Sequence, residues 1–263
     1  MSDKSKIEWT DATWNPVTGC TKVSPGCAHC YAEAFAKRFR GVPAHPYEQG
    51  FELKLWPARL DLPIAWKERK MIFVNSMSDL FHEDVPDDFI AKVFDVMSQA
   101  KHHIFQVLTK RSDRMLDWTR AHFCSEIQNK KSKAVWPNNV WLGVSLENQN
   151  YTWRIRHLQK SPAHIRFMSI EPLLSFISLD ASLLEAIQWV IVGGESGPRA
   201  RPMKPEWVYE IQKRCKKYRI PFFFKQWGTF DASGIRVGKK ASGRILDGKT
   251  WDEVPLSLSN LTR

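Results

Sequence analysis

The chain has 263 residues, enough for one large domain or two small ones with a substantial buried core. Apolar residues make up 43% and charged residues 25%, which excludes a largely disordered chain. Lys and Arg number 39 against 28 Asp and Glu, an excess that suits a polyanionic partner. No apolar run approaches the roughly 20 residues of a membrane helix. The N-terminus lacks the apolar region of a signal peptide, so we expect a cytoplasmic protein without a membrane partner.

Apolar, β-prone runs recur along the chain, and most are continuous, as is typical of strands covered on both faces. We predict strands at 14–19, 71–75, 104–108, 140–144, 166–170, 189–193 and 222–224. Helix-forming segments separate them, and we predict helices at 30–40, 89–100, 112–118, 148–159 and 205–218. This alternation favours a parallel sheet with right-handed crossovers. The sequence therefore predicts an α/β fold, a full or partial (β/α) barrel of six to seven parallel strands, with a doubly wound open sheet as the alternative.

Two stretches interrupt the alternation. Residues 41–63 are rich in Pro and aromatic residues, and we predict an ordered excursion there from a barrel domain that spans 1–227. Residues 228–263 contain five glycines and are predicted to form a turn-rich C-terminal extension. Positive charge gathers near this end, since residues 196–263 hold 15 Lys and Arg against 6 Asp and Glu. This basic quarter predicts a surface that faces phosphates, and a merely solvated basic face is the alternative.

Three of the five cysteines crowd into one short segment. Cys20, Cys27 and Cys30 are spaced C-x6-C-x2-C between the first predicted strand and the first predicted helix. An odd number of clustered thiols indicates a metal or redox site rather than a disulfide framework. Three soft thiolates can hold three corners of a [4Fe–4S] cluster and leave one iron open. Structural zinc, which needs a fourth ligand, is one alternative, and three structural thiols without a metal are the other.

The segments around these cysteines and after later strands resemble a known family. The resemblance is carried by residues 14–20, 27–32, 73–81, 143–148, 169–173, 193–197, 224–228 and 243–248. They make the chain similar to radical S-adenosylmethionine proteins, and more closely to a phage and bacterial three-cysteine-motif family of unclear function. The resemblance implies a [4Fe–4S] cluster and S-adenosylmethionine as cofactors, an electron donor as partner, and generation of a 5′-deoxyadenosyl radical. From the basic tail and the phage-like family we expect a nucleic acid or nucleotide as substrate, modified or repaired, and a protein partner is a further expectation.

Polar side chains follow the predicted strands, at the edge where barrels place their functional groups. The predicted cofactor-binding residues are His29, Ser76, Ser78, Asp79, Ser145, Glu147, Glu171, Gly193, Gly194 and Glu195. The predicted substrate-binding residues, whose cations suit phosphates or a carboxylate, are Lys110, Arg111, Arg199, Arg201 and Lys225. For each residue alone, an ion pair, a helix cap or a solvated charge is the alternative. No catalytic side chain beyond the cluster is predicted.

Aromatic and histidine side chains offer weaker signals. The candidates for stacking on nucleobases, with core packing as the alternative, are Trp9, Trp14, Trp56 and Trp227. The pair His102 and His103 precedes a strand, and we predict that it lies on the surface. Two functions stay open beside the radical enzyme. One is a non-enzymatic nucleic-acid-binding module with a structural zinc or cluster, and the other is a partner-dependent subunit whose cluster is structural or redox-sensing.

Overall fold

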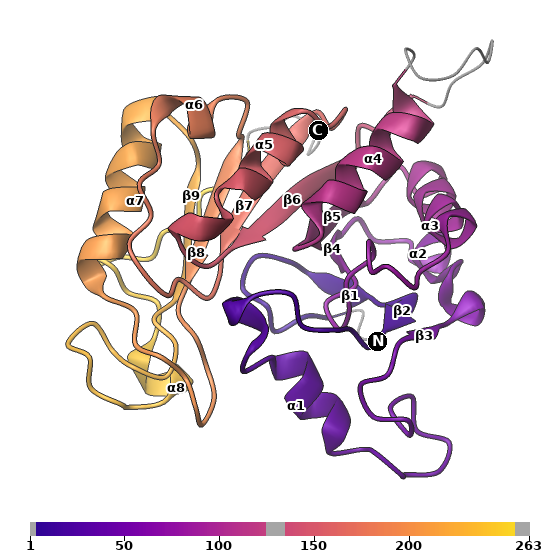
Figure 1. Ribbon diagram of the computed structural model, residues 1–263, viewed down its shortest axis with the longest axis horizontal. Coiled ribbons are helices and arrows are strands. Elements are labelled where there is room, and N and C mark those ends of the chain that lie inside the picture. Colours follow the sequence, from indigo (N-terminus) through magenta and orange to yellow (C-terminus); the bar gives the residue numbers. More distant parts are fainter. Residues whose placement is uncertain (1–3, 125–134, 256–263) are drawn as a thin grey trace. The chain divides into compact units, whose positions relative to one another are not determined.

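The computed structural model describes residues 4–124 and 135–255 and has an α/β fold (Figure 1). Its main strands are β1 (Ala12–Trp14), β4 (Met71–Val74), β5 (Ile104–Thr109), β6 (Val140–Leu146), β7 (Ile165–Ile170), β8 (Trp189–Gly193) and β9 (Phe222–Gln226). They form one seven-stranded sheet in this order, and the pairs β1–β4, β4–β5, β7–β8 and β8–β9 are parallel. The order runs from β1 to β9 without closing, within the described residues. The predicted α/β fold is thus confirmed, with the barrel partial rather than full.

Helices connect the strands. They are α1 (Tyr31–Lys37), α2 (Leu62–Ala65), α3 (Asp87–Gln99), α4 (Ser112–Phe123), α5 (Trp153–Gln159), α6 (Ala181–Leu184), α7 (Pro205–Tyr218) and α8 (Lys239–Ser242). In α3, two aspartates occupy the first turn, where the helix dipole favours negative charge. Apolar residues recur on one face of α3 and are buried there, as the 3.6-residue period predicts. No helix in the described part of the chain is long and apolar enough to cross a membrane.

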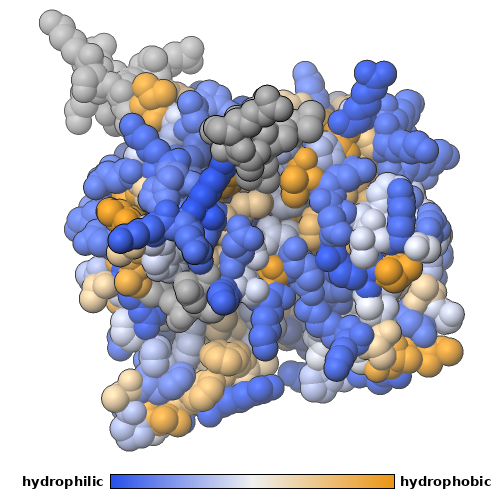
Figure 2. Space-filling model, turned by 180° about the vertical axis from the view of Figure 1, so that it is seen from behind, coloured by the Kyte–Doolittle hydropathy of each residue, from blue (hydrophilic) through white to orange (hydrophobic). Residues whose placement is uncertain are grey.

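The chain divides into two compact units. The first comprises residues 1–143 and 160–164, and the second comprises 144–159 and 165–263. In the first unit, Trp14, Ile72 and Phe105 are fully buried in the sheet. In the second, α5 packs on β7 and α7 on β9, over a core that includes Phe167 and Trp189. The face drawn in Figure 2 is mostly hydrophilic, and its hydrophobic side chains lie in small separate groups.

The first predicted strand, 14–19, is wrong in detail. The main sheet keeps only its first residue, because β1 ends at Trp14. The chain then forms β2 (Val17–Thr18), which pairs antiparallel with β3 (Lys54–Leu55) in a separate two-stranded sheet. Pro16 explains the break, because proline has no N–H to donate to a strand ladder. Its carbonyl accepts a hydrogen bond from the amide of Trp56 at 2.8 Å, which holds the two small strands together.

His103 is buried, contrary to the surface position predicted for it, and most of the tryptophans considered for stacking are buried too, in agreement with the alternative of core packing. His103 has no exposed surface, since its ring lies between α2 and the start of β5 and bonds the backbone of Lys70 and Pro63. The buried tryptophans are Trp9, Trp14 and Trp227. Trp56 is partly exposed, but the cations of Lys54 and Arg59 already cover its ring at 4.3 and 3.8 Å. The apolar side chains packed around the buried rings, and not their nearness to loops in the sequence, explain why these rings are buried.

Candidate functional site

The cysteine loop begins at a tightly held glycine in the first unit. Gly19 has φ +84°, and a Cβ built there would lie 2.1 Å from the carbonyl oxygen of Glu52. Its amide donates to the carbonyl of Met77 at 3.1 Å, and the amide of Cys20 donates to Phe51 at 3.3 Å. Only glycine fits this conformation and this close backbone approach. Cys20 is therefore fixed between two neighbouring loops of the chain.

The other two cysteines lie on one turn and at the start of a helix. Cys27 ends the 3₁₀ turn η1 (Pro25–Cys27), and its amide donates to the carbonyl of Ser24 at 2.9 Å. Cys30 directly precedes α1, and its carbonyl accepts the amide of Ala34 at 3.0 Å. All three are free, partly buried thiols. The loop thus presents three thiols from one continuous, hydrogen-bonded segment.

Electrostatics link the three thiols. Burial, reinforced by the Asp79 carboxylate and opposed by the Arg111 guanidinium, raises the pKa of Cys20 to about 11. Burial also raises the pKa of Cys30, against the effect of backbone amides at the start of α1 and of the Lys110 ammonium. Charge on Cys27 works to raise the pKa of both Cys20 and Cys30. Cys27 therefore lies within electrostatic reach of both outer cysteines, and each of these has a cation from the end of β5 acting on it.

Arg111 joins the cysteine loop to two carboxylates. Its guanidinium donates to the sulfur of Cys20 at 3.4 Å and to Glu83 at 2.8 Å, and lies 3.4 Å from Asp79. It also donates to the hydroxyl of Thr21 at 2.7 Å. Burial works to lower the pKa of Arg111, but these anionic neighbours outweigh it and the pKa is raised. A buried, always-charged group at this point would offset negative charge on the thiolates.

Asp79, predicted as a cofactor ligand, is occupied by the chain itself. Its carboxylate accepts the hydroxyl of Thr109 at 2.7 Å and the amides of Phe81 and Lys110 at 3.0 Å each. With Arg111 it has four donors and almost no exposed surface. Four donors fill the acceptor capacity of a carboxylate. In this structure Asp79 orients Arg111 and the end of β5.

The other predicted residues of the first unit lie around the same loop. The hydroxyl of Ser78 donates to the carbonyl of Val17 at 2.9 Å, and that of Ser76 donates to Asn15 at 3.2 Å. Both serines thereby fix the loop after β4 against β2. The Lys110 ammonium works to lower the pKa of Cys30, and His29 is partly buried between Cys27 and Cys30 in the sequence. All of these residues are brought together with the cysteines.

No three His, Cys, Asp or Glu side chains in the described ranges lie close enough together to hold one metal ion. The cysteine loop is therefore not a preformed single-ion site. In an iron–sulfur cluster each thiolate binds a different iron, so the sulfurs stand further apart than the ligands of one ion. The donor set of three free thiols flanked by two cations fits such a cluster in its chemistry.

In the second unit, Glu147 and Arg154 form a fully buried ion pair. Arg154 donates to Glu147 at 3.1 Å and to the carbonyl of Ser145 at 2.9 Å, and its guanidinium lies over the ring of Tyr151 at 4.3 Å. The Oε1 atom of Glu147 is buried and has no hydrogen-bond partner within 4–124 and 135–255. A buried carboxylate oxygen without a donor is costly, so this atom has acceptor capacity that a ligand's hydroxyl or ammonium would satisfy.

Two more carboxylates of the second unit are paired with predicted substrate-binding cations. Glu171, just after β7, accepts the ammonium of Lys225 at 2.6 Å and lies 3.3 Å from where a Cβ on Gly193 would be. Glu195, after β8, makes a bidentate pair with Arg201 at 2.6 and 2.8 Å. These cations are therefore bound to the predicted cofactor-binding residues.

The remaining predicted residues of this unit divide between packing and solvent. A Cβ on Gly194 would lie 1.9 Å from the carbonyl of Trp227, so the close approach of the β8 and β9 ends explains this glycine without a ligand. Ser145 is buried, and its carbonyl holds Arg154. Arg199 is exposed.

Sequence reasoning missed three partners that organise these groups: Thr21, Glu83 and Arg154. None belongs to a spacing pattern that marks a site. Arg154 had one usable signal, because it lies four residues before the apolar Leu158, on a helix face where an unpaired charge would be costly.

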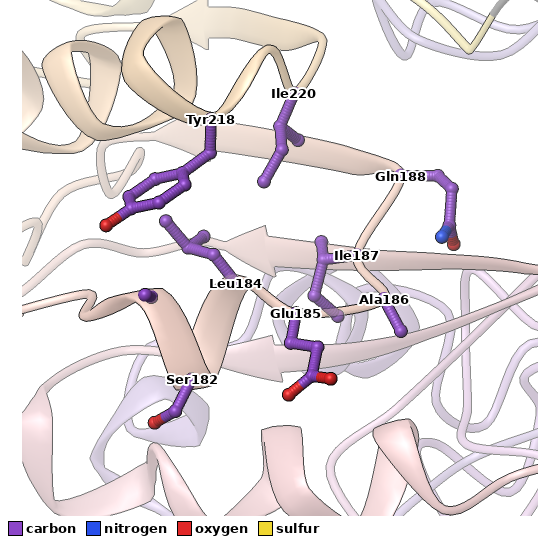
Figure 3. Close-up of a pocket in the computed structure, with 9 residues that line it drawn as sticks. Ser182, Leu184, Glu185, Ala186, Ile187, Gln188, Tyr218 and Ile220 are labelled. Carbon is purple, nitrogen blue, oxygen red and sulfur yellow. The ribbon is translucent and has the colours of Figure 1, made fainter.

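A pocket of about 610 Å³ lies elsewhere in the second unit, before the amino ends of β8 and β9 (Figure 3). Leu184, Ile187, Tyr218 and Ile220 line it, together with the polar residues Glu185 and Gln188. No predicted site residue contributes to its lining. The candidate residues of each unit therefore lie outside this pocket.

Fold and loop together define an open β/α barrel protein with a three-thiol loop after its first strands. The chain belongs to the DUF5131 family of proteins of unknown function, which matches residues 4–255. None of the curated proteins matches the chain. Among solved structures, a spore photoproduct lyase complexed with dinucleoside spore photoproduct is similar, at 12% identity and a TM-score of 0.40. That match covers 76% of this chain and 59% of the lyase chain.

Proposed function

We propose that Cys20, Cys27 and Cys30 hold a [4Fe–4S] cluster and that the protein is a radical S-adenosylmethionine enzyme. The substrate class that we propose is a nucleic acid or nucleotide, modified or repaired in the reaction. When bound, the cluster would supply one electron for cleavage of S-adenosylmethionine to a 5′-deoxyadenosyl radical.

One observation carries this proposal: three free thiols share one loop, electrostatically coupled, with Arg111 and Lys110 beside the outer two. Soft thiolates suit an iron–sulfur cluster, and three of them leave one iron for a further ligand. The pKa of Cys20 at about 11 means that the free loop holds a thiol there, so metal must displace its proton.

The chain's own groups prepare this loop. Arg111 and Lys110 offset the negative charge that three thiolates bring, and Asp79 holds Arg111 in place through their contact at 3.4 Å. Gly19 and the hydroxyl of Ser78 fix the approach of the loop to Cys20. Because these groups are buried or half-buried, their interactions are only partly screened by water.

In the second unit, Glu147 is the cofactor-binding candidate with an acceptor to spare. Its Oε1 atom has no donor among the described residues, whereas Asp79 in the first unit is fully occupied. We propose that Glu147 accepts a hydrogen bond from S-adenosylmethionine. Glu171 and Glu195, which follow the next two strands, are the other cofactor-binding candidates in this unit, and each already forms an ion pair with a cation of the chain.

The test is formation of 5′-deoxyadenosine by anaerobically reconstituted protein with dithionite and S-adenosylmethionine. We expect product from the wild type, and at most a trace from Cys27→Ala. Cys215→Ala is the matched control, because this cysteine is buried in α7 outside the loop, and it is expected to retain product formation. Iron-loaded wild type that forms no 5′-deoxyadenosine would refute the enzymatic proposal.

A further inference from the structure

We propose that Tyr31 and Phe35 of α1 form a stacking platform for the unpaired bases of a single-stranded nucleic acid. We call these two side chains the α1 platform. The inference deepens the proposed function, on which it rests for the place of the substrate in the reaction. The binding itself requires no cluster.

The α1 platform consists of two exposed aromatic rings on one helix face. Residues four apart in a helix lie next to each other. Tyr31 is 58% exposed and Phe35 is 42% exposed, whereas Ala32 and Ala36 bury the adjoining face of α1. Each ring therefore keeps a large part of its surface open to solvent.

Both rings are held in position. The hydroxyl of Tyr31 donates to the carbonyl of Ser76, and Phe35 packs edge-on against Tyr47 with a centroid separation of 5.7 Å. Phe35 also meets Phe39 at 5.0 Å. A ring that is already fixed loses little conformational entropy when a base stacks on it, so the platform is prepared for binding.

The helix that carries the platform also carries net positive charge. Lys22 and Lys37 both pair with the single carboxylate of Glu33, at 3.0 and 2.6 Å, which leaves one net positive charge in that group. The exposed Arg38 follows directly. Aromatic rings flanked by cations are the combination with which proteins bind single strands, through base stacking and phosphate attraction.

Size argues for bases and against a protein as the occupant. A large aromatic side chain offers roughly 150–250 Å², and about half of each ring is exposed here. The platform therefore offers on the order of 200 Å², far below the roughly 800 Å² per partner of a stable protein interface. One or two stacked bases match this area. The tryptophans considered from sequence cannot take this role, since three are buried and the fourth is covered by cations.

Position on the chain connects the platform to the proposed chemistry. Tyr31 directly follows Cys30, and its hydroxyl contacts the loop that carries Ser76 and Ser78. All these residues belong to the first unit. A base on Tyr31 would lie next to the cysteine loop.

The experiment measures binding of the full chain to a fluorescently labelled single-stranded oligothymidine by anisotropy, at low salt. We expect Tyr31→Ala and Phe35→Ala each to weaken binding about tenfold. Tyr31→Phe keeps the ring and is expected to retain binding. Phe176→Ala is the matched control, because Phe176 is 49% exposed in the second unit, and it is expected to leave binding unchanged. Lys37→Gln is expected to lower the slope of log affinity against log salt by about one.

Three results would overturn the inference. The wild type does not bind the oligonucleotide, Tyr31→Ala and Phe35→Ala bind it as tightly as the wild type does, or Phe176→Ala loses as much affinity as these two variants. Circular dichroism of each variant shows whether a loss of binding reflects misfolding, and Tyr31→Phe then decides whether the ring is required. Because 5′-deoxyadenosine formation is assayed without oligonucleotide, failure of the platform and failure of the proposed enzyme are separate results.

Discussion

Among single residues, the buried charged side chains carry the largest desolvation cost. Arg154 and Glu147 are both about fully buried, and each has a polar atom that finds no partner among the described residues. The pair therefore stabilises less than its contact distance suggests, and a ligand that supplied the missing partners would complete it. Arg111 differs, because its guanidinium is surrounded by acceptors, Cys20 included.

Removing Arg154 tests how much this pair matters. Arg154→Met leaves the Glu147 carboxylate buried without a cation, so we expect a loss of about 3–5 kcal/mol in the free energy of unfolding. Urea denaturation measures it, with Lys213→Met on the exposed face of α7 as the control for the loss of a cation. The double variant Glu147→Gln/Arg154→Met is expected to recover part of the loss. Equal midpoints for Arg154→Met and Lys213→Met would contradict the account of the pair.

His103 predicts a pH dependence of stability. Its Nδ1 accepts the amide of Lys70 at 3.2 Å while Nε2–H donates to the carbonyl of Pro63 at 2.9 Å, an arrangement that requires the neutral ring. Burial, helped by the neighbouring His102, lowers the pKa of His103 below its ordinary value of 6.5. The unfolded chain then binds the proton more readily, so this contribution is complete above 6.5 and is lost as the pH falls below it.

We therefore expect His103→Gln to show a smaller fall in unfolding free energy between about pH 7.5 and pH 5 than the wild type. Burial also lowers the pKa of His82, so part of the pH dependence remains in the variant. Urea titrations at several pH values measure the difference. Parallel curves for the two proteins would show that the neutral ring of His103 does not matter for stability.

Among the elements, the cysteine loop depends on how short strands and turns hold its ends. β2 and β3 pair beside the loop, Gly19 crosses the backbone of Glu52, and Cys30 leads into α1. The loop has no long strand or helix of its own, so these backbone contacts set where the thiols lie. Glycine at position 19 is the contact that a single substitution removes most cleanly.

Gly19→Ala should disturb the loop far more than another substitution at positive φ. Its Cβ would lie 2.1 Å from the Glu52 oxygen, so the backbone must move and Cys20 with it. Gly41→Ala is the matched control, since Gly41 has φ +78° but open space around it, and its expected cost is only about 1–2 kcal/mol. We expect reconstituted Gly19→Ala to retain much less iron than Gly41→Ala. Equal iron content would mean that this contact does not position the loop.

For the whole molecule, sequence periodicity predicted most of the architecture and little of the site's internal bonding. Strand β8 and helix α7 match their predicted ranges, because continuous apolar runs and an N-terminal proline are local signals. The prediction of the first strand was wrong where Pro16 interrupts the strand ladder. The prediction for His103 was wrong because the burial of its ring depends on distant segments such as α2. The cysteine spacing predicted a loop of three thiols. The hydrogen bond from Arg111 to Cys20, which are 91 residues apart, arises only from the fold.

Electron paramagnetic resonance of the reconstituted full chain shows whether the three-thiol loop binds a [4Fe–4S] cluster with one open iron. We predict about four irons per chain and, after reduction, a cluster signal that changes when S-adenosylmethionine is added. Cys20→Ala, Cys27→Ala and Cys30→Ala should each lose this signal. Protein that binds zinc and retains no iron after anaerobic reconstitution, or a cluster signal indifferent to all three substitutions, would contradict the account.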